Sequence, residues 1–249
     1  MKIGLIGAGN MAGALARGWN EPVLVADIDE GRATALADAV GGSVAGSNVE
    51  LAEQADVVVL CHKPAQLEDV AGEIREHANA VVSILGGVSV TIVEAAYPGK
   101  PVYRFMPNQP AEVRRGVSCY VAGSRAADGP EQEVVELFGR LGTVVAMPDE
   151  QVDVATALMS CSPAWIALVA EALVDAGVRR GLGQAEAERM VAETVAGTGA
   201  LLTGAQLSPE EVRRRVTSPG GLTERGTAAL EDAGLRAAFD SAVNAAISG

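Results

Sequence analysis

Short apolar runs alternate with amphipathic stretches over the first 147 residues, and this alternation constrains the fold more than any other feature. The seven runs have the length and composition of buried strands, and they span residues 2–7, 22–27, 56–61, 80–85, 101–106, 117–122 and 143–147. Stretches with helical periodicity lie between them, for example over residues 11–19, 30–39, 65–77 and 130–140. Strands that alternate with helices predict a mostly parallel sheet with helices on both faces.

The pattern changes at residue 149, beyond which no strand pattern returns and helical periodicity takes over. We expect helices over about residues 150–181, 184–203, 208–216 and 223–247, with starts and stops marked by Asp149, Gly181-Leu182-Gly183, Ser208-Pro209 and Ser218-Pro219. The expected fold class is therefore α/β with two domains. The alternating domain covers residues 1–148, and an all-helical domain covers residues 149–249.

A glycine-rich turn, Gly7-Ala8-Gly9-Asn10-Met11-Ala12, directly follows the first expected strand and opens a helix. In such a turn the first glycine permits the tight bend, the second lets the backbone approach a pyrophosphate, and a small sixth residue allows close helix packing. The helix N-terminus also offers free N–H groups to the phosphates. This context predicts a Rossmann-type dinucleotide-binding domain in which Gly7, Ala8, Gly9, Asn10 and Met11 bind the cofactor.

Asp27 ends the second expected strand, about 20 residues after the first glycine of this turn. A carboxylate there accepts hydrogen bonds from the ribose hydroxyls of NAD and repels the 2′-phosphate of NADP. Asp29 adds to the repulsion, whereas Arg32 could relieve it by binding a phosphate. We expect NAD(P)H as the cofactor and favour NADH over NADPH. The alternative for Asp27 is that it caps the following helix.

The expected helix over residues 150–181 is hydrophobic around nearly its whole circumference, which suits a helix buried on every side. The Ala-rich helices that follow offer few polar faces to hide that surface. We therefore expect a homodimer in which the helices of two chains interleave, with a larger homo-oligomer left open. The alternative is a monomer in which the sheet domain covers the helices.

The overall charge of the chain narrows the choice of partners. A formal net charge of −13 argues against nucleic acid and against an anionic membrane surface. A small anionic substrate is still compatible, because a local site can be positive in an acidic protein. The start MKIGLIGAGN has no signal-peptide pattern, and no stretch approaches the roughly 20 apolar residues that span a bilayer.

The cysteines and histidines suggest neither a disulfide framework nor a metal centre. Cys61, Cys119 and Cys161 are odd in number and far apart, which fits a reducing cytoplasm. His62 and His77 lack partners at ligand spacing, so we expect no metal. We also reject Cys161 as a nucleophile, because no histidine lies in a matching motif and a cysteine in an apolar helix is ordinarily inert.

Near the C-terminus, VTSPGGLTERG (216–226) interrupts a segment otherwise composed of residues typical of packed helices. Two adjacent glycines destabilise a helix, so we expect a turn with bare backbone at Ser218-Pro219-Gly220-Gly221, before a helix restarts at Thr223. Taken alone, such a turn is a connector between two helices.

Several blocks, in order along the whole chain, together resemble pyrroline-5-carboxylate reductase, the last enzyme of proline biosynthesis. They are GLIGAGNMAGAL (4–15), Lys63-Pro64, ILGGVS (84–89), RFMPNQPAEV (104–113), TALMSCSPAW (156–165), EALVDAGVRRGL (171–182) and VTSPGGLTERG (216–226). The resemblance implies a Rossmann domain followed by a helical dimerisation domain, with NAD(P)H as the cofactor. It also implies the reduction of a small anionic cyclic imine to L-proline.

The resemblance assigns substrate-binding residues to the glycine turn. It places the substrate carboxylate against backbone N–H groups there, so that Ser218, Gly220, Gly221, Leu222 and Thr223 bind the substrate. The Thr223 hydroxyl would reach the imine nitrogen and donate, accept or orient its proton, which makes Thr223 the catalytic residue. An imine is protonated readily near neutral pH, so no strong general acid is obligatory and positioning supplies much of the rate.

The same resemblance places Met106-Pro107-Asn108 near the nicotinamide and Lys63-Pro64 along the same wall. Lys63, Pro64, Met106 and Asn108 are therefore expected to bind the cofactor. A solvated surface lysine is the alternative for Lys63, and core packing is the alternative for Met106.

One block departs from the family pattern, in which it reads ALSGSGPAY. This chain has Met159 for a serine, Ser160 and Ser162 for glycines, Cys161 for a serine and Trp165 for a tyrosine. Added bulk there could narrow the pocket, turn it toward another ring, or disable it.

Two alternative functions follow from this departure. One is a related imine reductase that acts on a different cyclic imine. The other is a non-catalytic dinucleotide-binding protein, against which the retained Asn108, Gly220, Gly221 and Thr223 speak. Gln109, in place of the usual threonine, is a further change.

Overall fold

The structure is a computed structural model that describes residues 1–205 and 207–247. Residues 206, 248 and 249, which fall in the expected helical domain, lie outside the described part. The chain divides into two compact units, Met1–Ser160 and the residues from Cys161 onward. The domain boundary expected between residues 148 and 149 stays a prediction.

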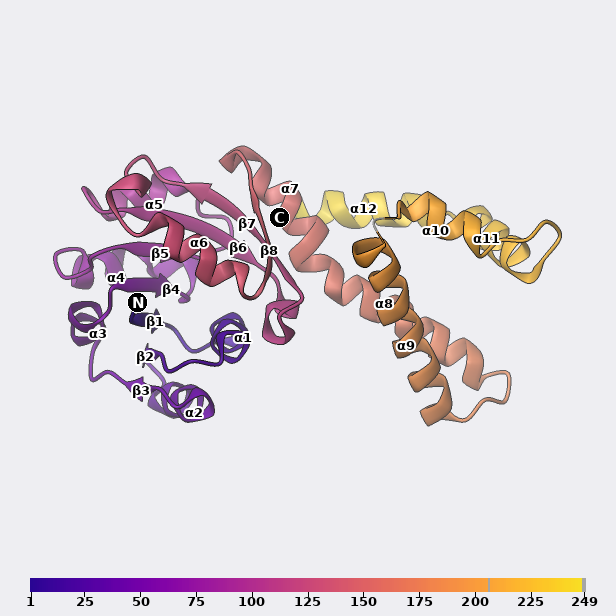
Figure 1. Ribbon diagram of the computed structural model, residues 1–249, viewed down its shortest axis with the longest axis horizontal. Coiled ribbons are helices and arrows are strands. Elements are labelled where there is room, and N and C mark those ends of the chain that lie inside the picture. The colour runs from indigo at the N-terminus through magenta and orange to yellow at the C-terminus, as the bar shows by residue number, and fades with distance from the viewer. Residues whose placement is uncertain (206, 248–249) are drawn as a thin grey trace. The chain divides into compact units, whose positions relative to one another are not determined.

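A single sheet runs through the first unit (Figure 1). Within the described residues it has eight strands in the order β3-β2-β1-β4-β5-β6-β7-β8. Neighbouring strands are parallel except for β6 and β7, so the expectation of a mostly parallel sheet is confirmed. The strands are β1 (Ile3–Ile6), β2 (Leu24–Ala26), β3 (Ser43–Val44), β4 (Val57–Leu60), β5 (Val81–Ser83), β6 (Val102–Pro107), β7 (Gly116–Ala122) and β8 (Gly142–Ala146).

Seven of these strands coincide with the seven apolar runs, and β3 is the strand that the sequence pattern missed. β3 has two residues, both exposed, so it leaves no apolar run in the sequence. It pairs with β2 at the edge of the sheet, where Val44 lies opposite Val25.

Helices cover both faces of the sheet. One face carries α1 (Asn10–Trp19), α2 (Glu30–Val40) and α6 (Glu131–Gly139), and the other carries α3 (Asn48–Gln54), α4 (Leu67–Ile74) and α5 (Val90–Ala96). Successive strand residues point to opposite faces, so Val58 of β4 belongs to one core and Val59 to the other. Burial on both faces explains why the strands read as unbroken apolar runs.

An aromatic cluster ties β6 to two of these helices. Phe105 of β6 stacks on Phe138 of α6 with ring centroids 3.9 Å apart, and Trp19 of α1 meets Phe138 edge-on at 5.6 Å. The Trp19 Nε1–H donates to the Leu137 carbonyl at 3.0 Å, so its one polar group is satisfied in the core. Strand β6, which ends in Pro107, is therefore packed firmly against α6 through Phe105.

The chain leaves the sheet through η4 (Asp149–Gln151), α7 (Val152–Thr156) and a π-helical turn, η5 (Ala157–Cys161). Val152 is buried in the core formed with α3, α4 and α5, and Met159 packs against that core. This stretch up to Ser160 therefore belongs to the first unit.

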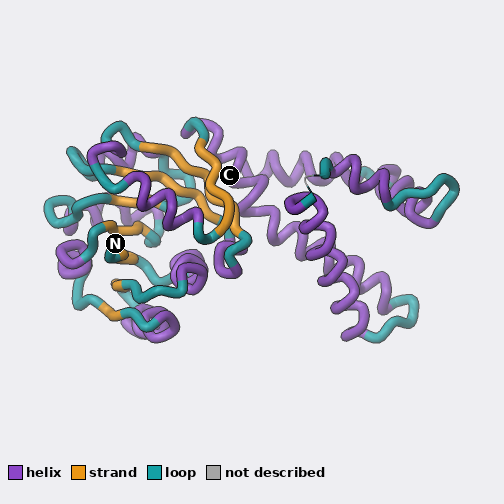
Figure 2. Tube along the Cα trace, viewed as in Figure 1, coloured by secondary structure: helices purple, strands orange, loops and turns teal. Residues whose placement is uncertain are grey.

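The second unit is helical in its described residues (Figure 2). The helix expected over residues 223–247 was wrong in one respect, because Gly234 divides it. Gly234 has φ +80°, in the left-handed region that favours glycine, and so ends a helix. The helices are α8 (Ser162–Val178), α9 (Gln184–Gly204), α10 (Pro209–Arg215), α11 (Leu222–Asp232) and α12 (Leu235–Ile247).

Helix α8 exposes most of its apolar side chains in the single chain. Ile166 is 51% exposed and Leu168 63%, whereas Val174 is the buried residue of this fully described helix. The helical stretch Asp149–Val178 has 30 residues and contains an 18-residue window with a mean hydropathy of 1.7, so by length and composition alone it could cross a membrane. The expectation that no stretch approaches this length was therefore wrong. A helix covered by a second chain would have the same character.

Candidate active site

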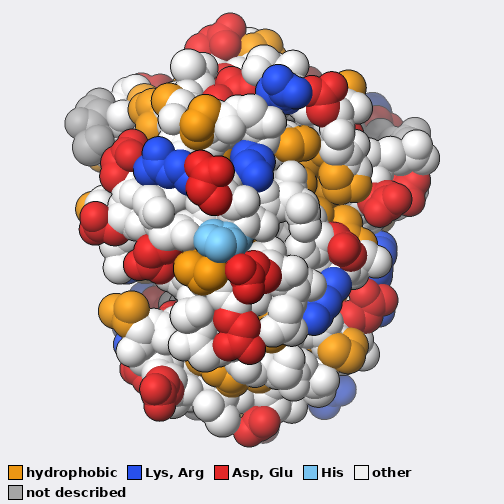
Figure 3. Space-filling view, turned by 90° about the vertical axis from the view of Figure 1, so that its left-hand side faces the viewer, with side chains coloured by type: hydrophobic (Ala, Val, Ile, Leu, Met, Phe, Trp, Pro, Cys, Tyr) orange, Lys and Arg blue, Asp and Glu red, His pale blue; other side chains and the backbone are white. Residues whose placement is uncertain are grey.

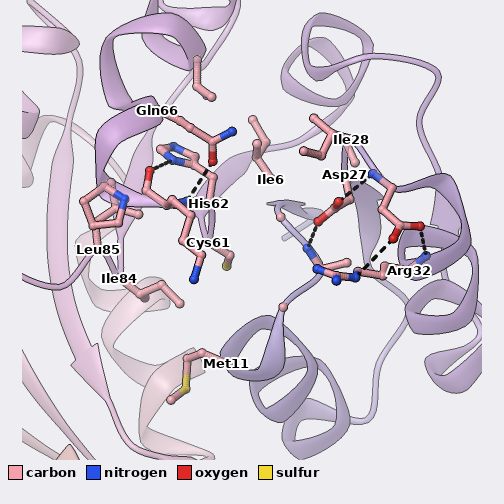
Figure 4. Close-up of a pocket in the computed structure, with 18 of the residues that line it drawn as sticks. Ile6, Met11, Asp27, Ile28, Arg32, Cys61, His62, Gln66, Ile84 and Leu85 are labelled. Carbon is pink, nitrogen blue, oxygen red and sulfur yellow. Dashed lines mark hydrogen bonds and ion pairs between the residues drawn. The ribbon is translucent and has the colours of Figure 1, made fainter.

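The carboxyl ends of β1, β2, β4 and β5 open onto a cleft of about 1030 Å³ (Figure 4). β1 lies between β2 and β4, so the strand order reverses here, and ligands of open parallel sheets bind at such a switch point. Loops that follow the four strands line the cleft. They contribute residues 7–11, 27–29, 61–64 and 84–86, joined by Arg32, Asn48, Gln66 and others.

The glycine turn after β1 has the backbone shape that its sequence predicted. Gly7 has φ +104°, and a Cβ there would lie 2.7 Å from the Cys61 carbonyl carbon, so only glycine fits. A Cβ on Gly9 would meet nothing within 4 Å, so the backbone of Gly9 is open to close approach. The first backbone bond of α1 runs from Gly13 N to Gly9 O at 2.9 Å. The preceding N–H groups therefore lack a helical partner and form a cradle for a phosphate.

Both carboxylate oxygens of Asp27 accept hydrogen bonds from the backbone. Oδ2 accepts from Ala8 N at 2.6 Å, and Oδ1 accepts from Asp29 N at 2.8 Å. The alternative that Asp27 caps α2 was wrong, because Asp29 is the cap and accepts from Arg32 N at 3.2 Å. Asp27 instead joins the end of β2 to the glycine turn, with its carboxylate in the cleft (Figure 4).

Arg32 stands at the rim of the cleft in an ion pair with Asp29. Arg32 Nε lies 3.3 Å from Asp29 Oδ2, and the two side chains are 68% and 51% exposed. Exposed pairs of this kind contribute about 0–1 kcal/mol. Arg32 is therefore held only weakly.

The loop after β4 forms the opposite wall. Lys63 is exposed and lines the cleft, and its N–H donates to Gln66 Oε1 at 3.1 Å. Pro64 begins the short helix η1 (Pro64–Gln66), which fixes the course of the backbone beside Lys63. Burial raises the pKa of the Cys61 thiol, so this cysteine stays protonated and is not a nucleophile.

His62 is a cleft residue that the sequence reasoning missed. Its Nδ1 lies 2.9 Å from the Lys63 carbonyl oxygen, which assigns the proton to Nδ1, and its Nε2 is buried without a hydrogen-bond partner among the described residues. Burial lowers the pKa of His62, although the bond to the Lys63 carbonyl opposes that shift. The sequence reasoning also missed four other residues that line the cleft. The signal that could have found them was their position after buried strands, and they are Gln66, Ile84, Leu85 and Gly86.

Met106 and Asn108 lie at the end of β6 and beyond it, and they are not among the residues that line the cleft. Met106 is 7% exposed and packs in the core with α3, α4 and α5, and Asn108 is 6% exposed. Their expected contact with the cofactor stays a prediction. Core packing, the alternative for Met106, is what the single chain shows.

The altered block, residues 159–165, is not among the residues that line this cleft. The Met159 side chain packs against the core, and its carbonyl accepts a hydrogen bond from Asn108 Nδ2 at 2.8 Å. Ser160 Oγ donates to the Pro107 carbonyl at 3.0 Å. Met159 and Ser160 are thus accommodated inside the first unit, whereas Cys161, Ser162 and Trp165 belong to the second.

The predicted turn at Ser218-Pro219-Gly220-Gly221 is present in the second unit. Gly220 has φ +71°, and the Gly221 N–H donates to the Ser218 carbonyl at 2.9 Å and closes the turn. Gly221 is also the N-cap of α11, and a Cβ there would overlap the Ser218 side chain. The two glycines are therefore required for different reasons, φ at Gly220 and space at Gly221.

The turn already holds a carboxylate, which is that of Glu224. Glu224 Oε2 accepts from Gly220 N at 2.7 Å. The first backbone bond of α11 runs from Arg225 N to Gly221 O at 3.3 Å, so the N–H groups of Leu222 and Thr223 precede the helical ladder. Leu222 is 80% exposed and Thr223 is exposed in the single chain. The amides of this turn are thus able to bind an acid group.

The sequence-predicted residues fall into three groups, of which Met106 and Asn108, near the end of β6, are one. Gly7, Ala8, Gly9, Asn10, Met11, Asp27, Lys63 and Pro64 line the cleft of the first unit, and residues 218 and 220–223 form the turn of the second. In the described part of the chain, no group of three or more His, Cys, Asp or Glu side chains could hold a metal ion.

Two family matches cover most of the chain. Residues 149–249 match the family described as pyrroline-5-carboxylate reductase dimerisation, and residues 2–87 match the family described as NADP oxidoreductase, coenzyme F420-dependent. The pyrroline-5-carboxylate reductase of Synechocystis is 33% identical over 255 residues, which cover 99% of this chain and 96% of that protein. The enzyme of that name from Mycobacterium tuberculosis is 34% identical, with 98% and 94% covered.

Solved structures show the same fold over the whole length. Pyrroline carboxylate reductase of Plasmodium falciparum with NADP bound has a TM-score of 0.88 at 26% identity, and 100% of this chain and 96% of that chain are covered. The 1-pyrroline-5-carboxylate reductase of Streptococcus pyogenes has a TM-score of 0.88 at 29% identity, with 100% and 97% covered.

Proposed function

The chain belongs to the pyrroline-5-carboxylate reductase family, and from this premise we propose that it reduces the C=N bond of 1-pyrroline-5-carboxylate to L-proline. Full-length relatives of that name at 33–34% identity support the assignment. The enzyme is an NAD(P)H-dependent oxidoreductase whose helical second unit is a dimerisation domain. When bound, the dihydronicotinamide supplies the hydride that the imine carbon receives.

The observation that carries the proposal is the carboxylate of Glu224 on the amide of Gly220. This contact supports the proposal that the turn binds an acid group without a cationic side chain. In the proposed complex the substrate carboxylate binds the amides of Leu222 and Thr223, or replaces Glu224 at Gly220. The end of α11 adds the favourable field of a helix N-terminus. Ser218 supports this arrangement, because its carbonyl fixes Gly221.

Thr223 is the proposed catalytic residue. Its position in the first turn of α11 puts a hydroxyl beside the amides that hold the substrate acid. In 1-pyrroline-5-carboxylate the imine nitrogen is bonded to the carbon that bears the carboxylate, so a group beside the acid is also close to the nitrogen. The hydroxyl can orient or hold the iminium proton, which makes the imine carbon electrophilic.

Both the backbone and the side chains that line the cleft suit a bound dinucleotide. The bare backbone at Gly9 and the start of α1 would hold the pyrophosphate, with Ala8, Asn10 and Met11 around it. Lys63 and Pro64 would line the nicotinamide side, and Met106 and Asn108 would shape it from the end of β6.

We propose that NADH is preferred to NADPH. The Asp27 carboxylate stands in the cleft beside the glycine turn, where a 2′-phosphate would meet its negative charge. Arg32 is the cationic side chain on the Asp27 side of the cleft that would favour NADPH, and its ion pair with Asp29 is exposed and weak.

The remaining assignments are proposals from charge and composition. The net charge of −13 speaks against nucleic acid and anionic membranes as partners. Figure 3 shows basic side chains interspersed with acidic ones on one face of the molecule. Three free cysteines fit the cytoplasm, and an assembly larger than the dimer stays open. The altered block does not line the dinucleotide cleft, so a related reductase that acts on a different cyclic imine is still the alternative, and the substrate comparison below tests it.

A substrate comparison tests the proposed function. The purified enzyme is given NADH or NADPH with 1-pyrroline-5-carboxylate, with 1-pyrroline, or with the six-membered imine acid, and the loss of nicotinamide absorbance is followed. We expect kcat/KM to be highest for 1-pyrroline-5-carboxylate and to fall at least tenfold for 1-pyrroline, which has the same ring without the acid. Equal rates with both five-membered rings would refute the role of the turn. No consumption with any imine, despite dinucleotide binding, would support a non-catalytic protein.

A further inference from the structure

Two hydrogen bonds join the π-helical turn η5 to the segment that ends β6. Asn108 Nδ2 donates to the Met159 carbonyl at 2.8 Å, and Ser160 Oγ donates to the Pro107 carbonyl at 3.0 Å. The bonds run in opposite directions between adjacent residues on each side. Both lie within the first unit, and they join segments 51 and 53 positions apart in the chain.

The Asn108 side chain is fixed at both ends. Its Oδ1 accepts from Val117 N of β7 at 2.9 Å, while its Nδ2 makes the bond to Met159, and the residue is 6% exposed. This orientation of the carboxamide follows from its partners, a donor on one side and an acceptor on the other. Asn108 therefore serves as a bridge between β7 and η5.

The sequence gives one reason for the Asn108 bond, because Pro163, four residues after Met159, has no N–H to donate to the Met159 carbonyl. A π-helical turn widens the helix and displaces carbonyl groups from the regular backbone ladder, so a displaced carbonyl needs a donor from elsewhere. Asn108 supplies that donor to Met159. π-helical turns inside α-helices occur frequently at functional sites.

Ser160 adds a bond that the family pattern does not provide, since a glycine stands there in ALSGSGPAY. A glycine has no hydroxyl to offer to the Pro107 carbonyl. The serine in place of a glycine thus joins η5 of this chain directly to the segment Met106-Pro107-Asn108. The proposed function places this segment near the nicotinamide.

We propose that Ser160 is a positioning residue that, together with Asn108, clamps the end of β6 to η5 and so fixes the nicotinamide side of the site. The clamp holds the peptide between Pro107 and Asn108 through two bonds to adjacent residues of η5. The effect of the clamp on turnover rests on the proposed function. Its effect on a bound dinucleotide can be measured without any imine substrate.

Variants of Ser160 and of a matched hydroxyl separate positioning from plain stability. Ser160→Ala removes the bond, Ser160→Gly restores the residue of the family pattern, and Ser160→Thr keeps the hydroxyl. Thr156→Val is the control, because Thr156 Oγ1 donates at 2.7 Å to Val152 O inside α7 and does not reach β6. The full-length protein is assayed for kcat and KM, for the fluorescence emission of bound NADH, and for thermal unfolding.

We expect Ser160→Ala and Ser160→Gly to lower kcat by about fivefold, which corresponds to about 1 kcal/mol at 1.36 kcal/mol per factor of ten. Both variants should also change the emission of bound NADH, because the surroundings of the ring become mobile. Ser160→Thr should restore both quantities, and Thr156→Val should leave both within twofold of the wild type at a comparable loss of stability.

The proposal is overturned if Ser160→Ala and Thr156→Val differ from the wild type only in thermal unfolding. It is also overturned if Ser160→Thr behaves like Ser160→Ala. If the wild type does not reduce 1-pyrroline-5-carboxylate, the proposed function has failed. The emission of bound NADH then still decides whether Ser160 fixes the site.

Discussion

Replacing Asp149 with asparagine should destabilise the protein more than replacing Arg104 with methionine, although both break the same ion pair. Arg104 of β6 is 3% exposed and pairs through Nη1 with Asp149 of η4. Its Nη2 lies 3.7 Å from Asp153, which is 65% exposed, and its Nε is buried without a hydrogen-bond partner among the described residues. Asp149 is 21% exposed and also accepts from Val90 N, at the start of α5, at 3.0 Å.

The asymmetry follows from what each variant leaves behind. Asp149→Asn leaves a guanidinium that is almost fully buried beside one distant, exposed carboxylate. Arg104→Met leaves a carboxylate that is partly exposed and still hydrogen-bonded to Val90. Loss of one partner of a buried pair costs about 3–5 kcal/mol, so we assign about 4–5 kcal/mol to Asp149→Asn and about 3 kcal/mol to Arg104→Met.

Thermal unfolding at a fixed protein concentration measures both costs, because dimer stability depends on concentration. At about 2–4 °C per kcal/mol for a chain of this size, Tm should fall by about 8–20 °C for Asp149→Asn and about 6–12 °C for Arg104→Met. The double variant should lose less than the sum of the single losses, since it leaves no uncompensated charge. Single variants within 2 °C of the wild type, or a larger loss for Arg104→Met, would refute this account of the pair.

Three further changes test the site. Thr223→Ala should lower kcat by about tenfold to a hundredfold through the loss of the hydroxyl at the imine nitrogen, with the Kd for NADH nearly unchanged; equal losses in both quantities would contradict the catalytic assignment. Asp27→Ser should raise the ratio of kcat/KM with NADPH to that with NADH by about tenfold, because a charge that repels the 2′-phosphate is removed; a ratio that does not move would show that Asp27 does not read the ribose. His62→Gln should reduce the loss of stability on acidification. The lowered pKa of His62 means that the unfolded chain binds a proton below about 6.5 before the folded chain does, so stability falls as the pH drops through that value until the folded pKa is reached. Tm values measured between pH 7 and pH 5 that fall in parallel for the two proteins would rule out this contribution.

The first unit could be predicted largely from local sequence. Strands buried on both faces leave apolar runs, and the turn at Gly7 combines a positive φ with a close approach to Cys61 that only glycine allows. β3 could not be predicted in this way, because its two exposed residues bury nothing. The break between α11 and α12 did leave a signal in the sequence, which is Gly234 itself. The apolar periodicity on both sides concealed it, and the structure shows that this glycine has a left-handed φ of +80°.

The residues of the site could be predicted from the sequence, but their side-chain contacts could not. The amides of Gly220 and Gly221 were expected at the turn, whereas the Glu224 carboxylate on Gly220 depends on a side-chain conformation that sequence does not specify. The bulk of Met159 suggested a narrower pocket. Its side chain packs against the core instead, and Asn108 bonds its carbonyl within the π-helical turn.

Isotope transfer tests the central claim most directly, namely that a dinucleotide in the cleft reduces the imine of an acid held at the glycine turn. The enzyme is incubated with 1-pyrroline-5-carboxylate and NADH that carries deuterium at the transferable position of the nicotinamide, and the product is analysed by mass spectrometry. The account predicts L-proline with one deuterium on the ring carbon that was the imine carbon, formed in step with NADH oxidation. Unlabelled proline, or no proline while the enzyme binds NADH, would contradict it.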